Sequence, residues 1–409
     1  MDHQLIIILD FGGHFSHSVA RRVRSLHVYC EVKPHTTPAA DLQAMKPAGV
    51  ILAGGQGFAN IGAPVFGIDP GDLDLRAGEL AEFLQNTCGC TGDWTMGDYV
   101  DQMVQEMKAK IGGGKVVCGL SGGVDSTVSA VMVHRAVGRQ LTCILVDHGL
   151  LRKDEADSVE RVCKEKFDMN FVRVNAQEEF LGKLAGVSDP EEKRRIIGET
   201  FIRVFERESK KIGKVGFLVQ GTIYPDVIES GKDGKDVVKS HHNVGGLPDA
   251  VDFDEILEPV RMLFKDEVRQ AGLALGIDEA LVRRQPFPGP GLGVRILEPI
   301  TPARVKTLQE ADAIFREEIE AAGLAGEISQ YFAVLTNIKA VGVRDGQRTY
   351  DSAIALRAIH TVDFMTAEAV PVPYAVLGRV SARILSEVPG VGRVVYDITS
   401  KPPGTIEYQ

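Results

Sequence analysis

The sequence lacks the features that mark membrane, secreted and nucleic-acid-binding proteins. No segment approaches the apolar length of a membrane span, and the opening residues Met1-Asp-His-Gln have neither the basic nor the apolar region of a signal peptide. The net charge of -10 argues against a general nucleic-acid binder. We therefore expect a cytoplasmic protein with no membrane and no nucleic-acid partner, which holds any anionic substrate in a local cationic pocket.

Cysteine is scarce, with six in 409 residues. The cysteines are scattered along the chain, which suits reduced core thiols better than a disulfide framework. Cys88 and Cys90 form the only close pair, and no further ligands at zinc-site spacing lie near them, so a structural role is favoured. The length and the balanced composition predict a globular chain of two or three domains.

The most informative segment is residues 121–126, Ser-Gly-Gly-Val-Asp-Ser. It joins an apolar run at 115–120 to a helical pattern that begins at Ser126, which predicts a strand, a phosphate-sized loop and a helix. The glycines let the backbone approach an anion, the serine hydroxyls can donate, and the first N–H groups of the helix add partial positive charge. The spaced glycine and the Lys-Ser/Thr pair of a Walker loop are missing. The pattern therefore predicts a pyrophosphate site of another kind.

This hexapeptide resembles the loop of the N-type ATP pyrophosphatases, which cut ATP between its alpha and beta phosphates and transfer the adenylyl group. Four longer segments are similar to the GMP synthetase family and occur in the family's order: residues 220–230, 239–247, 286–292 and 401–407. The resemblance implies that the acceptor is xanthosine 5'-monophosphate (XMP). Its C2 oxygen would be adenylylated and then displaced by ammonia, giving GMP, AMP and pyrophosphate.

The first 75 or so residues open like a doubly wound sheet. Residues 5–9 predict a strand, 16–26 an amphipathic helix and 49–55 a second buried strand. This opening resembles a class I glutamine amidotransferase, but the cysteine-bearing nucleophile elbow never arrives, and from about Leu75 the chain passes into a linker. The resemblance therefore implies a truncated remnant without glutaminase activity. Because such a sheet has open edges and little core, a docking remnant and a partly mobile segment both stay open.

The central part alternates strands and helices. Strands are expected at 115–120, 141–146, 171–175 and 216–220, and helices at 126–136, 154–167 and 189–211. This rhythm predicts a parallel sheet with crossover helices and ligands at the carboxyl ends of its strands. A segment rich in proline and glycine, 286–293, precedes an expected strand near 294–298, a long helix at 302–322 and mixed elements that end with 393–398.

The predicted fold class is α/β. The resemblance implies a central parallel-sheet, adenine-nucleotide alpha-hydrolase-like ATP pyrophosphatase domain, a C-terminal α+β dimerisation domain and a truncated flavodoxin-like N-terminal remnant. The expected domains are the remnant at 1–76, a linker at 77–96, the synthetase domain at 97–292 and the dimerisation and XMP-binding domain at 293–409.

The expected ATP site consists mainly of the loop and the first residues of the helix after it. The residues assigned to ATP are Ser121, Gly122, Gly123, Val124, Asp125, Ser126 and Thr127, with Val146 placed against the adenosine by resemblance. Adenylyl transfer needs Mg²⁺ to offset phosphate charge, and Asp125 is the candidate metal ligand. The alternative for Asp125 is capping of the following helix. His148, which follows Val146 closely, is given no catalytic role.

By resemblance, Asp226 and Glu229 would lie near the magnesium and the pyrophosphate, although carboxylates on a loop are usually only solvated. Lys239 would reach the phosphates from a lid that closes over the site and excludes water. Metal binding by the His-His pair at 241–242 is not favoured, because adjacent histidines point in different directions. Residues 231–236 are short, polar and rich in glycine, which predicts a mobile loop.

The XMP site is also assigned by resemblance. Its expected residues are Arg194, Gln330, Arg357, Lys401, Ile406 and Glu407. Arginine offers a planar fork that suits phosphate oxygens. The chain departs from the family pattern at Gln285, at Arg261 and in the terminal pair Tyr408-Gln409, and a shifted pattern at 343–348 keeps Asp345 out of the site.

Three functions remain open at this stage. The first is an ammonia-dependent XMP aminase that uses ATP and Mg²⁺ and forms a homodimer through its C-terminal domain. The second keeps glutamine as the nitrogen donor through a separate amidotransferase subunit. The third is a nucleotide-binding regulator that has lost catalysis, against which the intact loop at 121–127, Lys239 and Lys401 argue.

Overall fold

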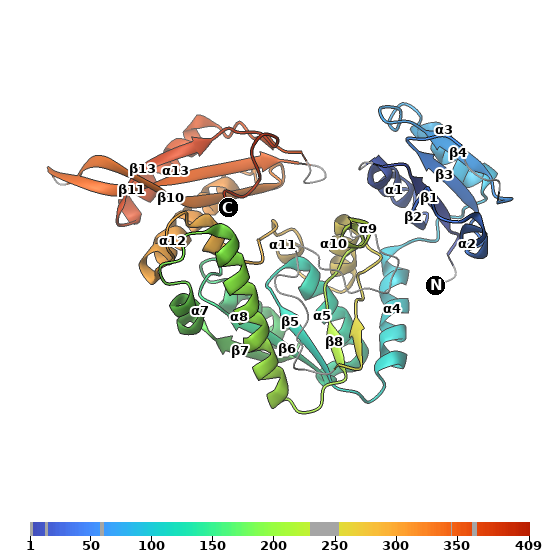
Figure 1. Ribbon diagram of the computed structural model, residues 1–409, viewed down its shortest axis with the longest axis horizontal. Helices are drawn as coiled ribbons and strands as arrows, with labels where there is room; N and C mark the ends of the chain where they lie inside the picture. The colour runs from blue at the N-terminus through green and yellow to red at the C-terminus, as the bar shows by residue number, and fades with distance from the viewer. Residues whose placement is uncertain (1–2, 13–14, 58–60, 230–252, 345, 362–365) are drawn as a thin grey trace. The chain divides into compact units, whose positions relative to one another are not determined.

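The computed structural model describes residues 3–12, 15–57, 61–229, 253–344, 346–361 and 366–409 (Figure 1). The chain divides into two compact units. Unit 1 comprises Met1–Lys110, Thr222–Val238 and Pro259–Asp278, and unit 2 comprises Ile111–Gly221, Lys239–Glu258 and Glu279–Gln409. Within the described ranges, no helix is long and apolar enough to cross a membrane. The domain limits expected from the sequence stay predictions.

Unit 1 contains a four-stranded parallel sheet in the order β2-β1-β3-β4. Its strands are β1 (Ile6–Asp10), β2 (Cys30–Pro34), β3 (Gly49–Ala53) and β4 (Val65–Ile68), and its first helices are α1 (Phe15–Ser25) and α2 (Ala39–Ala44). Because side chains alternate along a strand, residues of β1 belong to two different apolar clusters. Ile6 and Ile8 pack with residues of α1, whereas Ile7 and Leu9 pack with Leu42 of α2. The expected strands and helix of the remnant are confirmed, and the remnant is folded.

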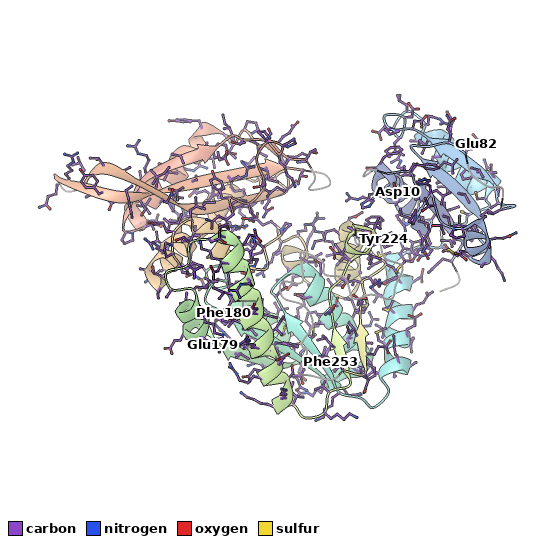
Figure 2. The ribbon with its side chains drawn as sticks, viewed as in Figure 1. Asp10, Glu82, Glu179, Phe180, Tyr224 and Phe253 are labelled. Atoms are coloured by element: carbon purple, nitrogen blue, oxygen red, sulfur yellow. The ribbon has the colours of Figure 1, made fainter. Side chains whose placement is uncertain are left out.

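Later segments of the chain complete this core. Unit 1 continues with α3 (Ala77–Glu82), a π turn (Phe83–Thr87), α4 (Met96–Ile111), α9 (Tyr224–Glu229) and α10 (Lys265–Ala274). Tyr224 of α9 (Figure 2) and Phe264 join the cluster that holds Ile6 and Ile8. The hydroxyl of Tyr224 also accepts a 2.6 Å hydrogen bond from the backbone N–H of Val32 in β2. The remnant is thereby joined to segments that lie far along the sequence.

A buried arginine lies at the centre of this junction. The guanidinium of Arg24 lies 3.2 Å from Glu267 and donates a 2.8 Å hydrogen bond to the carbonyl oxygen of Cys30. It also covers the rings of Tyr29 and Trp94, at 4.5 and 4.3 Å from their centroids. The indole N–H of Trp94 donates to Glu267 at 2.5 Å. One carboxylate therefore holds a cation and an indole that come from two other parts of the chain.

Unit 2 begins with a five-stranded, all-parallel sheet in the order β7-β6-β5-β8-β9. Its strands are β5 (Val116–Leu120), β6 (Leu141–Asp147), β7 (Asn170–Asn175), β8 (Phe217–Val219) and β9 (Glu255–Leu257). Its helices are α5 (Val124–Val137), α6 (Glu155–Arg161, continued by a π turn to Lys166), α7 (Gln177–Lys183) and α8 (Pro190–Lys211). The predicted parallel sheet with crossover helices is confirmed.

The rest of unit 2 is an α+β module. It contains α11 (Glu279–Val282), α12 (Pro302–Ala321), β10 (Gln330–Arg344), β11 (Gln347–His360), β12 (Glu368–Ala369), α13 (Tyr374–Glu387) and β13 (Val391–Asp397). Strands β10, β11 and β12 are antiparallel, and β13 lies parallel to β11. The long helix expected at 302–322 is confirmed.

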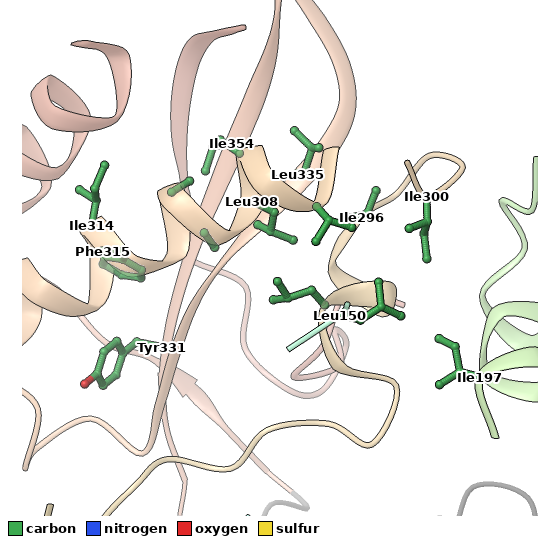
Figure 3. Packing of buried hydrophobic residues seen from close by; sticks show 14 of the residues in the cluster. Leu150, Ile197, Ile296, Ile300, Leu308, Ile314, Phe315, Tyr331, Leu335 and Ile354 are labelled. Atoms are coloured by element: carbon green, nitrogen blue, oxygen red, sulfur yellow. The ribbon is translucent and has the colours of Figure 1, made fainter. Parts of the chain in front are cut away.

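The strand expected near 294–298 is wrong. Residues Gly291–Arg295 form a short 3-10 helix, and Ile296 makes only an isolated bridge to Leu335. The apolar residues here are buried as a strand would bury them, but the backbone N–H of Leu292 bonds to the carbonyl oxygen of Leu150 instead of to a strand partner. Leu150, Ile296, Leu308 and Leu335 lie in one apolar cluster (Figure 3). This cluster joins the parallel sheet to the α+β module.

Replacing Glu267 with alanine should destabilise unit 1, because it leaves the Arg24 charge buried without its carboxylate. We expect a loss of about 3 kcal/mol. Trp94 is the only tryptophan in the chain, so its fluorescence during chemical denaturation reports this junction directly. Asp266→Ala, at the neighbouring exposed carboxylate, should change stability by less than about 0.5 kcal/mol. Equal midpoints for the two variants would contradict the role given to Glu267.

Candidate active site

The loop at 121–123 lies where the parallel sheet reverses its order. Strand β5 is flanked by β6 on one side and β8 on the other, so the chain leaves β5 at the topological switch point, where open α/β sheets bind ligands. Gly122 has a φ of +77°, which favours glycine. A Cβ at this position would lie 3.4 Å from Oε1 of Glu155. The loop therefore passes close to a carboxylate of the next crossover.

Hydroxyl groups shape the loop from within. The hydroxyl oxygens of Ser121 and Ser126 lie 3.1 Å apart, and the Thr127 hydroxyl donates a 2.8 Å hydrogen bond to the carbonyl oxygen of Gly123. Gly123 is the N-cap of α5, and no side chain caps the helix there. The first N–H groups of a helix without a side-chain cap can bind an anion. This geometry supports the predicted phosphate loop.

Asp125 and Val146 differ in what they can offer a nucleotide. Asp125 lies in the first turn of α5 and is not at the N-cap position, so it is placed as an acidic residue near a positive helix end. Val146, on β6, has its side chain in the apolar core with 1% exposure, so only its backbone can line a nucleotide.

His148 is a structural histidine. Burial lowers its pKa to about 4, and its Nδ1 accepts a 3.0 Å hydrogen bond from the N–H of Leu150. Its ring is therefore neutral at pH 7.

Gly221, which sequence reasoning did not assign to the site, faces the loop from the end of β8. A Cβ at Gly221 would lie 2.9 Å from the backbone nitrogen of Ser126, closer than packed atoms allow. The end of β8 can thus lie this close to the start of α5 only because residue 221 has no side chain. The strand-end position of Gly221 was the available signal in the sequence.

The C-terminal tail gathers most of the residues predicted to bind XMP. Arg357, on β11, is buried and donates to the carbonyl oxygens of Thr399, Thr405 and Ile406 at 2.7–2.9 Å. It also pairs with Asp397 at 2.7 Å. Its guanidinium is directed at the protein's own tail, so Arg357 acts in the structure as the anchor of that tail.

Glu407 is held from two sides. Arg295, with no exposed surface, makes a two-pronged contact with the Glu407 carboxylate at 2.9 and 2.7 Å. Gln330, at the start of β10, donates to the same carboxylate at 3.3 Å. Burial opposes the charge of Arg295, but Glu407 and Asp312 compensate, so the pKa of Arg295 is raised. Arg295 was missed from the sequence, where an arginine inside an apolar run was its only signal.

Arg194 and Lys401 also contact or belong to the tail. Arg194, on α8, donates a 2.6 Å hydrogen bond to the backbone oxygen of Gln409. The backbone of Lys401 pairs with Ala367 in an isolated bridge. Hydrogen bonds thus link Arg194, Gln330, Arg357, Ile406 and Glu407 to one another or to the tail that carries Lys401.

The residues predicted to be catalytic lie elsewhere in the chain. Asp226 and Glu229 belong to α9 in unit 1, where the Asp226 carboxylate accepts a 3.0 Å hydrogen bond from the N–H of Ile223. Lys239, the histidines at 241–242 and the loop at 231–236 lie outside the described residues. The roles of these residues stay predictions.

Three family models match parts of the chain. They are the class-I glutamine amidotransferase at residues 7–66, NAD synthase at 95–192 and the GMP synthase C-terminal domain at 317–408. The amidotransferase match thus covers only the four-stranded remnant and ends within β4.

Curated relatives match the chain over its whole length. "GMP synthase [glutamine-hydrolyzing]" of Clostridium botulinum (strain Eklund 17B) is 47% identical over 513 residues, and that of Acetivibrio thermocellus is 46% identical over 511; both alignments cover 100% of each chain. Because the alignments are longer than this chain of 409 residues, the relatives have residues where this chain has gaps.

Solved structures with weaker similarity include the NMN synthetase from Francisella tularensis, with 16% identity, a TM-score of 0.37 and coverage of 49% of this chain and 79% of that one. The NH3-dependent NAD synthetase from Campylobacter jejuni also has 16% identity, with a TM-score of 0.35 and coverage of 46% and 77%.

Substituting Gly221 with alanine should weaken the use of ATP, because the new methyl group would meet the Ser126 backbone nitrogen. We expect kcat/KM for ATP to fall about 100-fold, at the lower end of the effect of losing one oxyanion donor. Steady-state kinetics with ATP as the varied substrate measure this. Gly182→Ala, at an exposed helical glycine with no atom within 4 Å of the added carbon, is the matched control. Equal effects at both positions would show that the contact with the loop is unimportant.

Proposed function

Because the chain belongs to the family of the glutamine-hydrolysing GMP synthases, we propose that it converts XMP to GMP with ammonia and has no glutaminase of its own. The family assignment makes it a carbon–nitrogen ligase of the ATP pyrophosphatase type that uses ATP in purine nucleotide synthesis. It confirms the resemblance and the fold class predicted from the sequence, including the amidotransferase fragment.

The first step is transfer of the adenylyl group. The C2 oxygen of XMP attacks the alpha phosphorus of ATP, and pyrophosphate leaves; ammonia then adds at C2, and AMP departs with that oxygen. The start of α5, which has no side-chain cap and against which Gly221 packs, supports binding of the departing pyrophosphate by backbone N–H groups. This loop geometry is the observation that carries the proposal.

Magnesium would neutralise charge on the phosphates when it is bound, and Asp125 is the residue proposed to hold it. Within the described ranges, no three His, Cys, Asp or Glu side chains gather in a metal-binding group. That fits an ion held by one or two carboxylates and the phosphates of the substrate. We also propose Asp226 and Glu229 for the magnesium and pyrophosphate, and Lys239 for the phosphates.

The tail is proposed to form the XMP subsite. Arg194, Gln330, Lys401, Ile406 and Glu407 would contact the nucleotide, with the strongest support from the convergence of Gln330 and Arg295 on Glu407. For Arg357 we propose a supporting role, because its donors contact tail carbonyl oxygens and Asp397.

The chemistry of the cysteines in the remnant and in the linker supports the loss of the glutaminase. A nucleophilic cysteine needs a lowered pKa or a nearby base. Burial instead raises the pKa of Cys30 to about 11 and that of Cys88 to about 12, and also raises the pKa of Cys90. All six cysteines are free thiols, as expected.

A separate amidotransferase that supplies ammonia in the cell is the second candidate. It is favoured by the glutamine-hydrolysing names of the relatives and by a remnant that is folded despite its missing block.

We further propose a homodimer formed through the C-terminal module. Val341 and Tyr350 face each other across β10 and β11, and Val343 follows two residues on along the same face. All three are exposed, at 46%, 63% and 76% for Val341, Tyr350 and Val343. An exposed apolar ribbon of this kind is typical of a surface that a partner covers.

Pure protein should make GMP from XMP, ATP and Mg²⁺ when ammonium chloride is the nitrogen source, and should make none with glutamine. The reason is that the chain retains the pyrophosphatase loop but has no cysteine with a lowered pKa in the remnant or the linker. Chromatographic quantification of GMP and AMP measures both reactions, with XMP omitted as the control. Glutamine working as well as ammonium would contradict the loss of the glutaminase.

Replacing Val343 and Tyr350 with aspartate should dissociate the dimer, because two charges would have to be buried in an apolar contact. Light scattering after size exclusion should give about twice the 44.3 kDa chain mass for the wild type and the single-chain mass for this variant. A matched double variant on the opposite face, Gln347→Asp with Thr349→Asp, should remain dimeric. A monomeric wild type would refute the proposal.

A further inference from the structure

The segment that follows β6 contacts the phosphate loop on one side and residues that hold the C-terminal tail on the other. Glu155, the first residue of α6, is 6% exposed, and its Oε2 accepts a 3.0 Å hydrogen bond from the N–H of Arg152. Its other oxygen, Oε1, lies 3.4 Å from where a Cβ on Gly122 would be. The Glu155 carboxylate therefore packs directly against the phosphate loop.

Arg152 extends this contact away from the loop. It is 5% exposed, and its Nη1 lies 3.9 Å from Oε1 of Glu155. Its Nη2 donates a 3.2 Å hydrogen bond to the carbonyl oxygen of Pro286, and its guanidinium covers the ring of Phe287 at 4.3 Å. Burial lowers the pKa of Arg152 to about 10, so the side chain is charged at pH 7.

The dipeptide Pro286-Phe287 is shared with the tail. The carbonyl oxygen of Pro286 also accepts from Gln330 at 3.5 Å, and Gln330 in turn donates to Glu407. The ring of Phe287 also lies 5.4 Å from Arg295, which donates two hydrogen bonds to the Glu407 carboxylate. A continuous line of contacts thus runs from Gly122 through Glu155, Arg152 and Pro286-Phe287 to Glu407, entirely within unit 2.

These buried contacts contribute little to the stability of the fold. Buried ion pairs often contribute no more than well-packed apolar residues of the same volume. Nε of Arg152 and Nη1 of Arg295 are buried without a hydrogen-bond partner among the described residues, which adds a desolvation cost. What such a network supplies is fixed geometry, and in-line transfer between two bound nucleotides needs fixed geometry.

We propose that Arg152 and Glu155 are positioning residues for adenylyl transfer, which fix the phosphate loop relative to the tail that holds the acceptor nucleotide. They do not contact the reacting atoms. Because an error of about 1 Å in a bound geometry can cost about 100-fold in rate, their effect should fall on the chemical step and leave binding nearly intact. The inference rests on the proposed function, since it assumes ATP at the loop and XMP at the tail.

The test compares Arg152→Met, Arg152→Lys and Glu155→Gln with Lys153→Met, at the exposed neighbour of Arg152. The readouts are kcat and KM for ATP and XMP with ammonium, and XMP-dependent exchange of labelled pyrophosphate into ATP. Arg152→Met should lower kcat and the exchange rate about 100-fold, with each KM changed less than about threefold. Arg152→Lys keeps the positive charge but lacks the planar guanidinium, so it should recover part of the rate. Lys153→Met should match the wild type.

Glu155→Gln keeps the acceptor for the Arg152 N–H and removes the charge, so it should lower kcat about tenfold. It also leaves the Arg152 charge buried without its carboxylate, so its melting temperature should fall, and kcat is compared at a temperature where circular dichroism shows the variant folded. It decides the question if Arg152→Met does not fold. A kcat within threefold of the wild type in both Arg152→Met and Glu155→Gln, or a loss confined to KM, would overturn the positioning role. A wild-type protein that makes no GMP would instead overturn the proposed function.

Discussion

The close approach of the Pro/Gly-rich segment to the end of β6 is the constraint on which the proposed site depends. The N–H of Leu292 bonds to the carbonyl oxygen of Leu150 at 2.8 Å, and a Cβ at Gly291, whose φ is +61°, would come within 2.3 Å of that oxygen. Only glycine fits there. This contact places Pro286-Phe287 beside Arg152, so that the phosphate loop and the tail share one framework.

Contacts with later segments of the chain explain why the N-terminal remnant is folded. A four-stranded sheet with two open edges would be a weak domain alone. Here Tyr224 and Phe264 complete one of its apolar clusters, and Glu267 satisfies both Arg24 and Trp94. These contacts within unit 1 account for the order of the remnant.

Much of the architecture could be predicted from the sequence, because its signals are local. The apolar run before Ser121 and the glycines after it define a strand, a loop and a helix, and the alternation that follows defines the parallel sheet. The strand expected near 294–298 failed because burial alone does not distinguish a strand from a 3-10 turn whose N–H groups bond to Leu150. The roles of Arg295 and Arg152 depend on partners 112 and 134 residues away, and that of Gly221 depends on Ser126 at the start of another helix, so no local pattern could reveal them.

The central claim is that ATP activates the C2 oxygen of XMP by adenylylation on this chain. The most direct measurement uses XMP labelled with ¹⁸O at C2, together with ATP, Mg²⁺ and ammonium, and follows the label by mass spectrometry. The account predicts that the label appears in the phosphate of AMP, because that oxygen leaves C2 attached to the adenylyl group. Label in pyrophosphate or in water, with unlabelled AMP, would contradict it.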